Sequence, residues 1–116
     1  MNDIVTLYHN AFGVAFYWKR NEVPLTKRIQ IIFRDTGLLI TPRELNIFAQ
    51  LILQARKEGT ACENCPMNEN CRSWLVNTPA AQITLAMNAK ELDAIEDLVE
   101  GTLFQLGLNA MLGKLL

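Results

Sequence analysis

The sequence has little net charge, a single histidine and no recognisable catalytic motif. Its 11 basic and 12 acidic side chains give a formal net charge of −1, so no global field attracts nucleic acid or an anionic membrane. There is no G-x-G-x-x-G, no P-loop and no nucleophile elbow, and His9 has no recognisable nucleophile beside it. These absences favour a non-enzymatic protein without a nucleic-acid partner, and we assign no catalytic residue.

We expect neither a targeting signal nor a membrane span. The first residues show no basic stretch followed by an apolar run and a cleavage site, so we expect no secretory signal. The uncharged stretch from Gly101 to Gly113 is too short to cross a hydrocarbon core of about 30 Å. We therefore expect a cytoplasmic protein without a membrane-spanning helix.

Apolar residues are plentiful enough for one core. Half of the 116 residues are hydrophobic, and this length is near the commonest size of a single domain. We predict one domain over 1–116. It comprises a β-rich unit with a helix (1–59), a cysteine loop (60–72), and a second strand–helix unit with an apolar tail (73–116).

Local patterns predict an α+β fold with the element order β-β-β-α-β-β-α. Two helices among these strands cannot all be crossovers of a parallel sheet. We therefore expect an antiparallel sheet of about five strands, covered by two main helices. Alternating, β-branched and aromatic residues indicate the strands at 12–20, 27–33, 38–40, 73–76 and 82–87.

Both helices are predicted to begin with a capping box. The run Thr-Pro-Arg-Glu at 41–44 starts the first helix, and Asn-Ala-Lys-Glu at 88–91 starts the second. The same offset relates the apolar residues around the two boxes, so we infer a weak strand–helix repeat over 36–53 and 83–100. Duplication and independent use of a common cap are both open explanations. In the first helix we expect an inward stripe of Leu45, Phe48, Ile52 and Ala55.

The last segment, 98–116, holds many leucines and only two charged residues, Glu100 and Lys114. One helix face cannot bury that much apolar surface. We expect the segment either to break near Gly107 and wrap the core or to pack against a second subunit. A homodimer is our prediction.

Three cysteines, Cys62, Cys65 and Cys71, fall within ten residues in the spacing C-x2-C-x5-C. An odd number cannot pair fully as disulfides within one chain, and this spacing lets thiolates hold a metal from a tight loop. A zinc site would need a fourth ligand, and His9 is the only histidine. The candidate metal ligands are therefore these three cysteines and His9.

Three interpretations of the cysteine run stay open: unmodified thiols without metal, structural zinc, or an iron–sulfur cluster. The run resembles zinc knuckles and the three-cysteine segments of iron–sulfur proteins, such as auxiliary-cluster domains of radical enzymes and cluster-bearing nucleases related to recombination helicase subunits. Those iron–sulfur families use a fourth cysteine outside the run, which this chain lacks. A thiol enzyme is disfavoured because the run follows a predicted helix instead of starting one.

Two clusters of charge are expected to be solvated surface. Basic residues gather around the first hairpin beside three aromatic residues, a composition that a small nucleic-acid patch would use. Acidic residues line the second predicted helix, where like charges four residues apart favour exposure or a basic partner. The clusters are Lys19, Arg20, Lys27 and Arg28 beside Phe16, Tyr17 and Trp18, and Glu91, Asp93, Glu96, Asp97 and Glu100.

Several short runs resemble an uncharacterised bacterial family of small proteins. They include residues 7–17, 31–33, 38–41 and 91–92. Members of that family tend to carry a further cysteine pair where this chain has Trp18 to Val23, and the resemblance implies no particular activity. We therefore expect a small binding or scaffolding module whose cysteine loop holds structural zinc. The alternative is an iron–sulfur redox or sensor protein.

Overall fold

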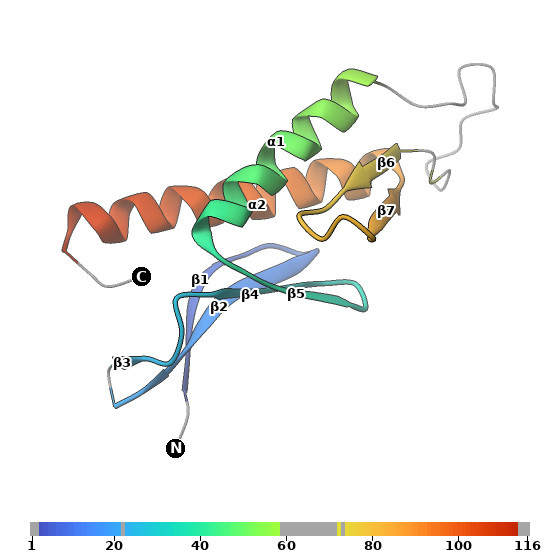
Figure 1. Cartoon of the computed structure of the whole chain (residues 1–116). Coiled ribbons are helices and arrows are strands. Elements are labelled where there is room, and N and C mark those ends of the chain that lie inside the picture. Colours follow the sequence, from blue (N-terminus) through green and yellow to red (C-terminus); the bar gives the residue numbers. More distant parts are fainter. Residues whose placement is uncertain (1–2, 22, 59–71, 73, 114–116) are drawn as a thin grey trace.

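The N-terminal third of the chain forms an antiparallel sheet. The computed structural model describes residues 3–21, 23–58, 72 and 74–113. Four strands pair in the order β1-β2-β4-β5, and the short β3 pairs with the end of β2 (Figure 1). The strands are β1 (Asp3–His9), β2 (Gly13–Arg20), β3 (Val23–Pro24), β4 (Ile29–Phe33) and β5 (Thr36–Ile40).

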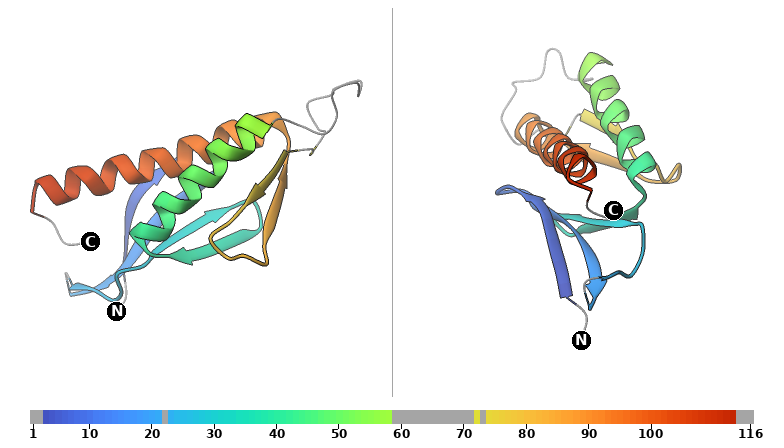
Figure 2. Two further views of the ribbon diagram at one scale, coloured as in Figure 1. Left: turned by 45° about the horizontal axis from the view of Figure 1, so that its top comes forward. Right: turned by 90° about the vertical axis from the view of Figure 1, so that its left-hand side faces the viewer.

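The rest of the described chain forms two helices and a small second sheet. Both helices lie on one face of the five-stranded sheet, and no described element covers its other face (Figure 1 and Figure 2). α1 packs against α2 and β6, and α2 also crosses β1 and β2. These elements are α1 (Pro42–Glu58), β6 (Trp74–Asn77), β7 (Thr84–Met87) and α2 (Ala89–Met111).

The α+β class with an antiparallel sheet of five strands and two helices is confirmed. Two of the strands predicted for this sheet do not belong to it, because β6 and β7 pair only with each other. β1 and the short β3 complete the five strands instead. The alternation in β1 is hidden by a shift of register between Thr6 and Tyr8, which inserts Leu7 as an extra residue.

Both predicted capping boxes form. The side chain of Thr41 accepts from the N–H of Glu44 at 3.1 Å, and the Glu44 carboxylate accepts from the N–H of Thr41 at 2.9 Å. Asn88 and Glu91 make the same reciprocal pair at 2.8 and 3.0 Å. Each box satisfies amides that the first helical turn leaves without a partner. Descent of the two units from one duplicated segment stays a prediction.

The core lies between the helices and the facing side of the sheet. The predicted stripe of α1 is buried as expected. From the sheet, alternate residues of β4 and β5 point to the helices and are almost inaccessible to solvent. The main contributors are Leu45, Phe48 and Ile52 from α1, Leu92, Ile95, Leu98 and Val99 from α2, and Ile29, Ile31, Phe33, Leu38 and Ile40 from the sheet.

α2 runs without interruption past Gly107 to Met111, so the first of the two alternatives for this segment, a break near Gly107, is wrong. Packing of the segment against a second subunit stays a prediction. A helical glycine costs about 1 kcal/mol relative to alanine. Burial of the apolar Leu106 and the hydrogen bond that the Gln105 amide donates to Asn109 at 3.1 Å offset this cost. No helix in the described part of the chain is long and apolar enough to cross a membrane.

Candidate functional site

The four predicted metal ligands divide between two parts of the chain. Cys62, Cys65 and Cys71 lie outside the described residues. His9 is exposed at the end of β1, opposite Val14 of β2. Within 3–21, 23–58, 72 and 74–113, no group of histidine, cysteine or carboxylate side chains is placed to hold a metal ion. A metal site of the three cysteines with His9 therefore stays a prediction.

Side chains from both ends of the connection that carries the cysteines bind the start of α2. Arg56, in the last turn of α1, donates to Asp93 at 2.7 Å and to Glu96 at 3.2 Å. Arg72 donates to the two carboxylate oxygens of Glu91 at 3.1 and 3.3 Å. The acidic side of α2 thus holds both ends of this connection. The expectation that these carboxylates form only a solvated surface is therefore wrong for Glu91, Asp93 and Glu96.

Glu91 is the most constrained of these carboxylates. Its side chain is only 12% exposed and also lies 3.3 Å from the guanidinium of Arg34. Burial alone would raise the pKa of Glu91, but the backbone hydrogen bond from Asn88 and the charges of Arg72 and Arg34 hold that pKa below its usual value. The start of α2 is therefore fixed by a capping box and two ion pairs together.

The turn between β1 and β2 docks on α2 through Tyr8 and Asn10. The Tyr8 hydroxyl donates to both oxygens of Asp97, at 3.0 and 2.9 Å. The Asn10 amide donates to Asp97 at 2.9 Å and to the carbonyl of Ala94 at 3.0 Å, while its oxygen accepts from two backbone N–H groups of the turn. The hydrogen bond to Asp97 raises the pKa of the Tyr8 hydroxyl.

A shallow pocket of about 350 Å³ lies beside this turn, with Phe12, Lys90, Asp93 and Asp97 among its lining residues. Its carboxylates already accept hydrogen bonds from within the fold. Asp97 binds two side chains of the β1–β2 region, and Asp93 binds Arg56. We assign this cluster a structural role, because it joins the sheet and α1 to α2.

The face of the sheet that points away from the helices does not belong to the core. Successive side chains of a strand point to opposite faces, and Ile31 and Phe33 point to the helices. Gln30 and Ile32 therefore point away from them. We call this surface the outer face. It comprises Ile4, Thr6, His9, Val14, Phe16, Trp18, Arg20, Val23, Leu25, Gln30, Ile32, Gly37 and Leu39.

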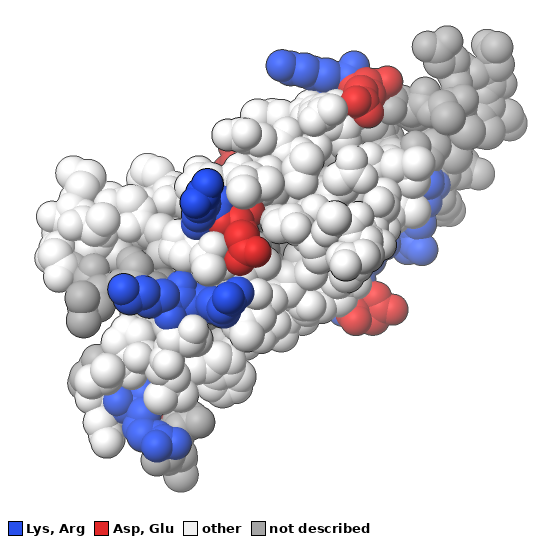
Figure 3. Space-filling view, viewed as in Figure 1, with Lys and Arg blue, Asp and Glu red and all other residues white. Residues whose placement is uncertain are grey.

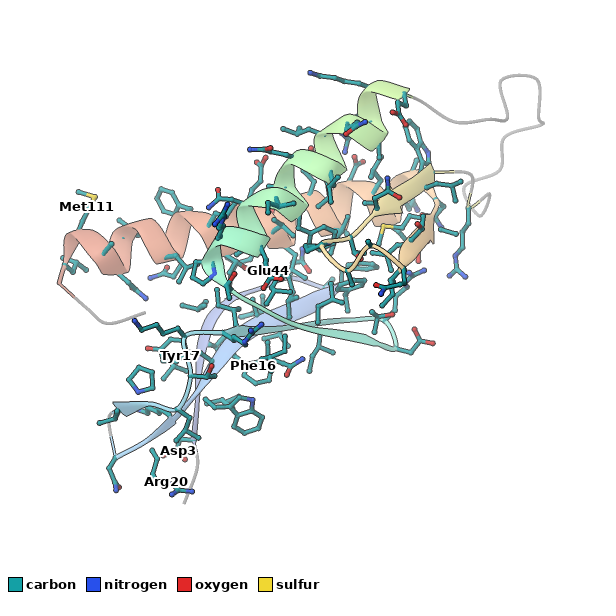
Figure 4. The ribbon with its side chains drawn as sticks, viewed as in Figure 1. Asp3, Phe16, Tyr17, Arg20, Glu44 and Met111 are labelled. Atoms are coloured by element: carbon teal, nitrogen blue, oxygen red, sulfur yellow. The ribbon has the colours of Figure 1, made fainter. Side chains whose placement is uncertain are left out.

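Cross-strand pairing places these residues in adjacent rows. Trp18 pairs with Ile4 on one side, and its carbonyl accepts from the N–H of Leu25 on the other. Phe16 lies one row further along β2, on the side of the sheet away from the helices (Figure 4). The successive rows are Arg20 and Val23; Ile4, Trp18 and Leu25; Thr6, Phe16, Gln30 and Leu39; and His9, Val14, Ile32 and Gly37.

Large apolar side chains on the outer face remain in contact with solvent. Phe16 is the exception and is buried, because Trp18 packs edge-on against its ring with centroids 5.4 Å apart. Phe16 does not belong to the core cluster between the sheet and the helices. The others are between 38% and 61% exposed. They are Ile4, Trp18, Val23, Leu25, Ile32 and Leu39.

Charge is confined to the ends of this surface. The charged residues within β1 to β5 are Asp3, Lys19 and Arg20, all at the end of the sheet next to β3. Figure 3 shows basic side chains gathered at that end of the molecule. Arg28 of the predicted basic cluster lies 3.6 Å from Glu44 of α1. The middle of the outer face is thus uncharged and largely apolar, with Thr6 and Gln30 as its polar residues.

Comparisons of the chain with protein-family models, with characterised proteins and with solved structures find no match. The outer face was not predicted from the sequence. The signal for it is the unbroken apolar run Ile31-Ile32-Phe33, in which residues on both faces of β4 are large and apolar. A strand with one solvated face normally alternates apolar and polar residues.

Proposed function

We propose that this protein is a non-enzymatic binding module that associates with another protein surface through the outer face of its sheet. The observation that carries the proposal is that this face exposes six large apolar side chains and has no charged residue at its centre. Antiparallel sheets normally present polar residues to water on an uncovered face. Contiguous exposed apolar patches mark interaction sites when they exceed a few hundred Å².

The size of the outer face is consistent with such a site. Its rows extend over β2 from Val14 to Arg20 and across four strands, from β1 to β5. With strands about 4.8 Å apart and residues about 3.3 Å apart, this is a surface of roughly 14 by 20 Å between backbone positions. A surface of this area, left in water, would favour association.

The proposal is tested by charging the face. Leu39→Lys places a lysine in the third row, and Leu53→Lys, on the exposed side of α1, is the matched control because the two leucines are 48% and 44% exposed. Neither change should unfold the protein. We expect Leu39→Lys to abolish self-association and to reduce binding of a hydrophobic dye, while Leu53→Lys changes neither. A native protein that neither associates nor binds the dye would refute the proposed function.

We also propose that Cys62, Cys65 and Cys71 bind structural zinc, with His9 as the candidate fourth ligand. The support is their spacing and the chemistry of thiolates, which are soft ligands suited to zinc. The attachment of Arg56 and Arg72 to α2 is compatible with a connection whose two ends are fixed.

Metal analysis of anaerobically purified protein tests the zinc proposal. We expect near-stoichiometric zinc in the native chain, its loss in Cys65→Ser, and weaker binding in His9→Ala. Unchanged zinc affinity in His9→Ala would remove this histidine from the site. Absence of metal from the folded native protein would overturn the zinc proposal, and iron with acid-labile sulfide would establish the cluster alternative instead.

A further inference from the structure

We infer that the surface bound by the outer face is the outer face of a second copy of this chain, packed against it around a two-fold axis. This inference rests on the proposed function and names its partner. In a two-fold dimer the same patch is used by both subunits, so the patch must complement itself. A face whose centre is uncharged and largely apolar satisfies this condition, because stacking that centre on its own copy buries no charge.

The chemistry of the face disfavours a charged ligand. Single-stranded nucleic acid requires a basic groove that follows its phosphates in addition to stacking aromatic residues. Phe16 and Trp18 supply aromatic rings, but among the described strand residues Arg20 is the only cation that points to this side. A sheet face composed of aromatic and branched side chains is instead suited to a second sheet, stacked at about 10 Å.

The area of the face is sufficient for a weak dimer. At about half exposure each, six large apolar side chains offer roughly 500 Å² per subunit, or about 1,000 Å² in total. This total is near the lower limit of about 1,000 Å² for a specific interface. We therefore expect a dimer that dissociates on dilution.

Charges at opposite ends of the sheet determine how the two copies are oriented. Arg20 ends the row next to β3. Asp35, in the turn between β4 and β5, is exposed at the other end, beyond the pair formed by Phe33 and Thr36. A two-fold axis that lies between the two stacked sheets and runs perpendicular to the strands places each Arg20 near the partner's Asp35. An axis parallel to the strands would bring the two Arg20 side chains together, so the perpendicular axis is favoured.

Exchanging these two charges tests both the partner and its orientation. In homodimers of Arg20→Glu, each introduced glutamate faces the partner's Asp35. In homodimers of Asp35→Arg, each introduced arginine faces the partner's Arg20. A mixture of the two variants can form a heterodimer in which both contacts are between opposite charges. We expect each variant alone to dimerise at least about tenfold more weakly than native protein, and the equimolar mixture to recover native dimerisation.

Sedimentation velocity and native mass spectrometry over a range of protein concentrations measure this recovery, with Lys57→Glu on the exposed side of α1 as the charge-reversal control. Recovery on mixing supports the inference because an effect within one chain cannot be repaired by another chain. A dimer insensitive to both substitutions, or not restored by mixing, overturns it.

Two further outcomes separate this inference from the proposed function. A protein that is monomeric at every concentration, yet loses dye binding on Leu39→Lys, overturns the second copy as partner and leaves the binding face intact. Binding of a fluorescent single-stranded oligonucleotide that is lost on Trp18→Ala and persists in the Leu53→Lys control overturns both, because the face then binds nucleic acid.

Discussion

Both faces of the five-stranded sheet carry large apolar side chains, and they differ in what covers them. On the inner face, helices reduce Ile31 to 0% exposure, whereas Ile32, the next residue of β4, is 38% exposed on the outer face. The same residue type in the same strand therefore has opposite environments. Apolar composition does not by itself define a core. A covered apolar face stabilises the fold, and an uncovered one remains available to a partner.

Truncating the two neighbouring isoleucines should separate the faces most clearly. Ile31→Ala removes fully buried methyl groups and leaves a cavity, so we expect a loss of about 3 to 4 kcal/mol of unfolding free energy. Ile32→Ala should cost under about 1 kcal/mol at concentrations where the protein is monomeric. Urea denaturation of dilute protein measures both. Equal losses would mean that the outer face is as well packed as the inner one.

The cover of the inner face depends on how α2 begins. Glu91→Gln weakens the capping box and both arginine contacts, and we expect a loss of about 2 kcal/mol at neutral pH. Because folding lowers the pKa of Glu91, its stabilisation is present above the unfolded value near 4.5 and is lost as pH falls through the folded pKa. The variant and native protein should therefore converge in acid.

Glu44→Gln is the matched control at the other capping box. Backbone and side-chain hydrogen bonds with Thr41 also lower the pKa of Glu44. This carboxylate is 38% exposed and has one cation, Arg28, at 3.6 Å, so its loss should matter less. Thermal unfolding between about pH 3 and pH 7 compares the variants across the range in which carboxylates titrate. A larger effect at Glu44 than at Glu91 would contradict the greater contribution to stability that burial and two arginines give to Glu91.

Two glycines of α2 should respond in opposite directions to alanine. A Cβ at Gly101 would lie about 2.5 Å from the ring of Tyr8, which is held by Asp97, so we expect a loss of about 1 kcal/mol. A Cβ at Gly107 meets nothing within 4 Å, so Gly107→Ala should gain about 0.5 to 1 kcal/mol from helix propensity. Denaturation midpoints measure the difference, and a gain at both sites would show that the contact of β1 with α2 is loose.

Features that depend on short stretches of sequence were predictable. The capping boxes of both helices and the buried stripe of α1 follow from residues three or four positions apart, and both are confirmed. Local spacing fixes these structures because their hydrogen bonds and contacts lie within one or two helical turns.

Features that depend on distant pairing were not predictable in the same way. β1 was not predicted because Leu7 interrupts its alternation of residues. The hydrogen bond of Tyr8 with Asp97 was not predicted because it joins residues 89 positions apart. Exposure of Ile32 depends on where the helices pack, which no local pattern specifies. The cysteine run was prominent in the sequence, but its three residues lie outside the described structure, so its metal stays a proposal.

Hydroxyl-radical footprinting of the two tryptophans in the native chain tests the outer face most directly. Trp18 lies on that face, and Trp74 of β6 packs against the core and serves as the internal control. We predict that oxidation of Trp18 falls as protein concentration rises through the dimer dissociation constant, while oxidation of Trp74 stays constant. Oxidation of Trp18 that is independent of concentration, in a protein that sediments as a dimer, would contradict burial of this face between two copies.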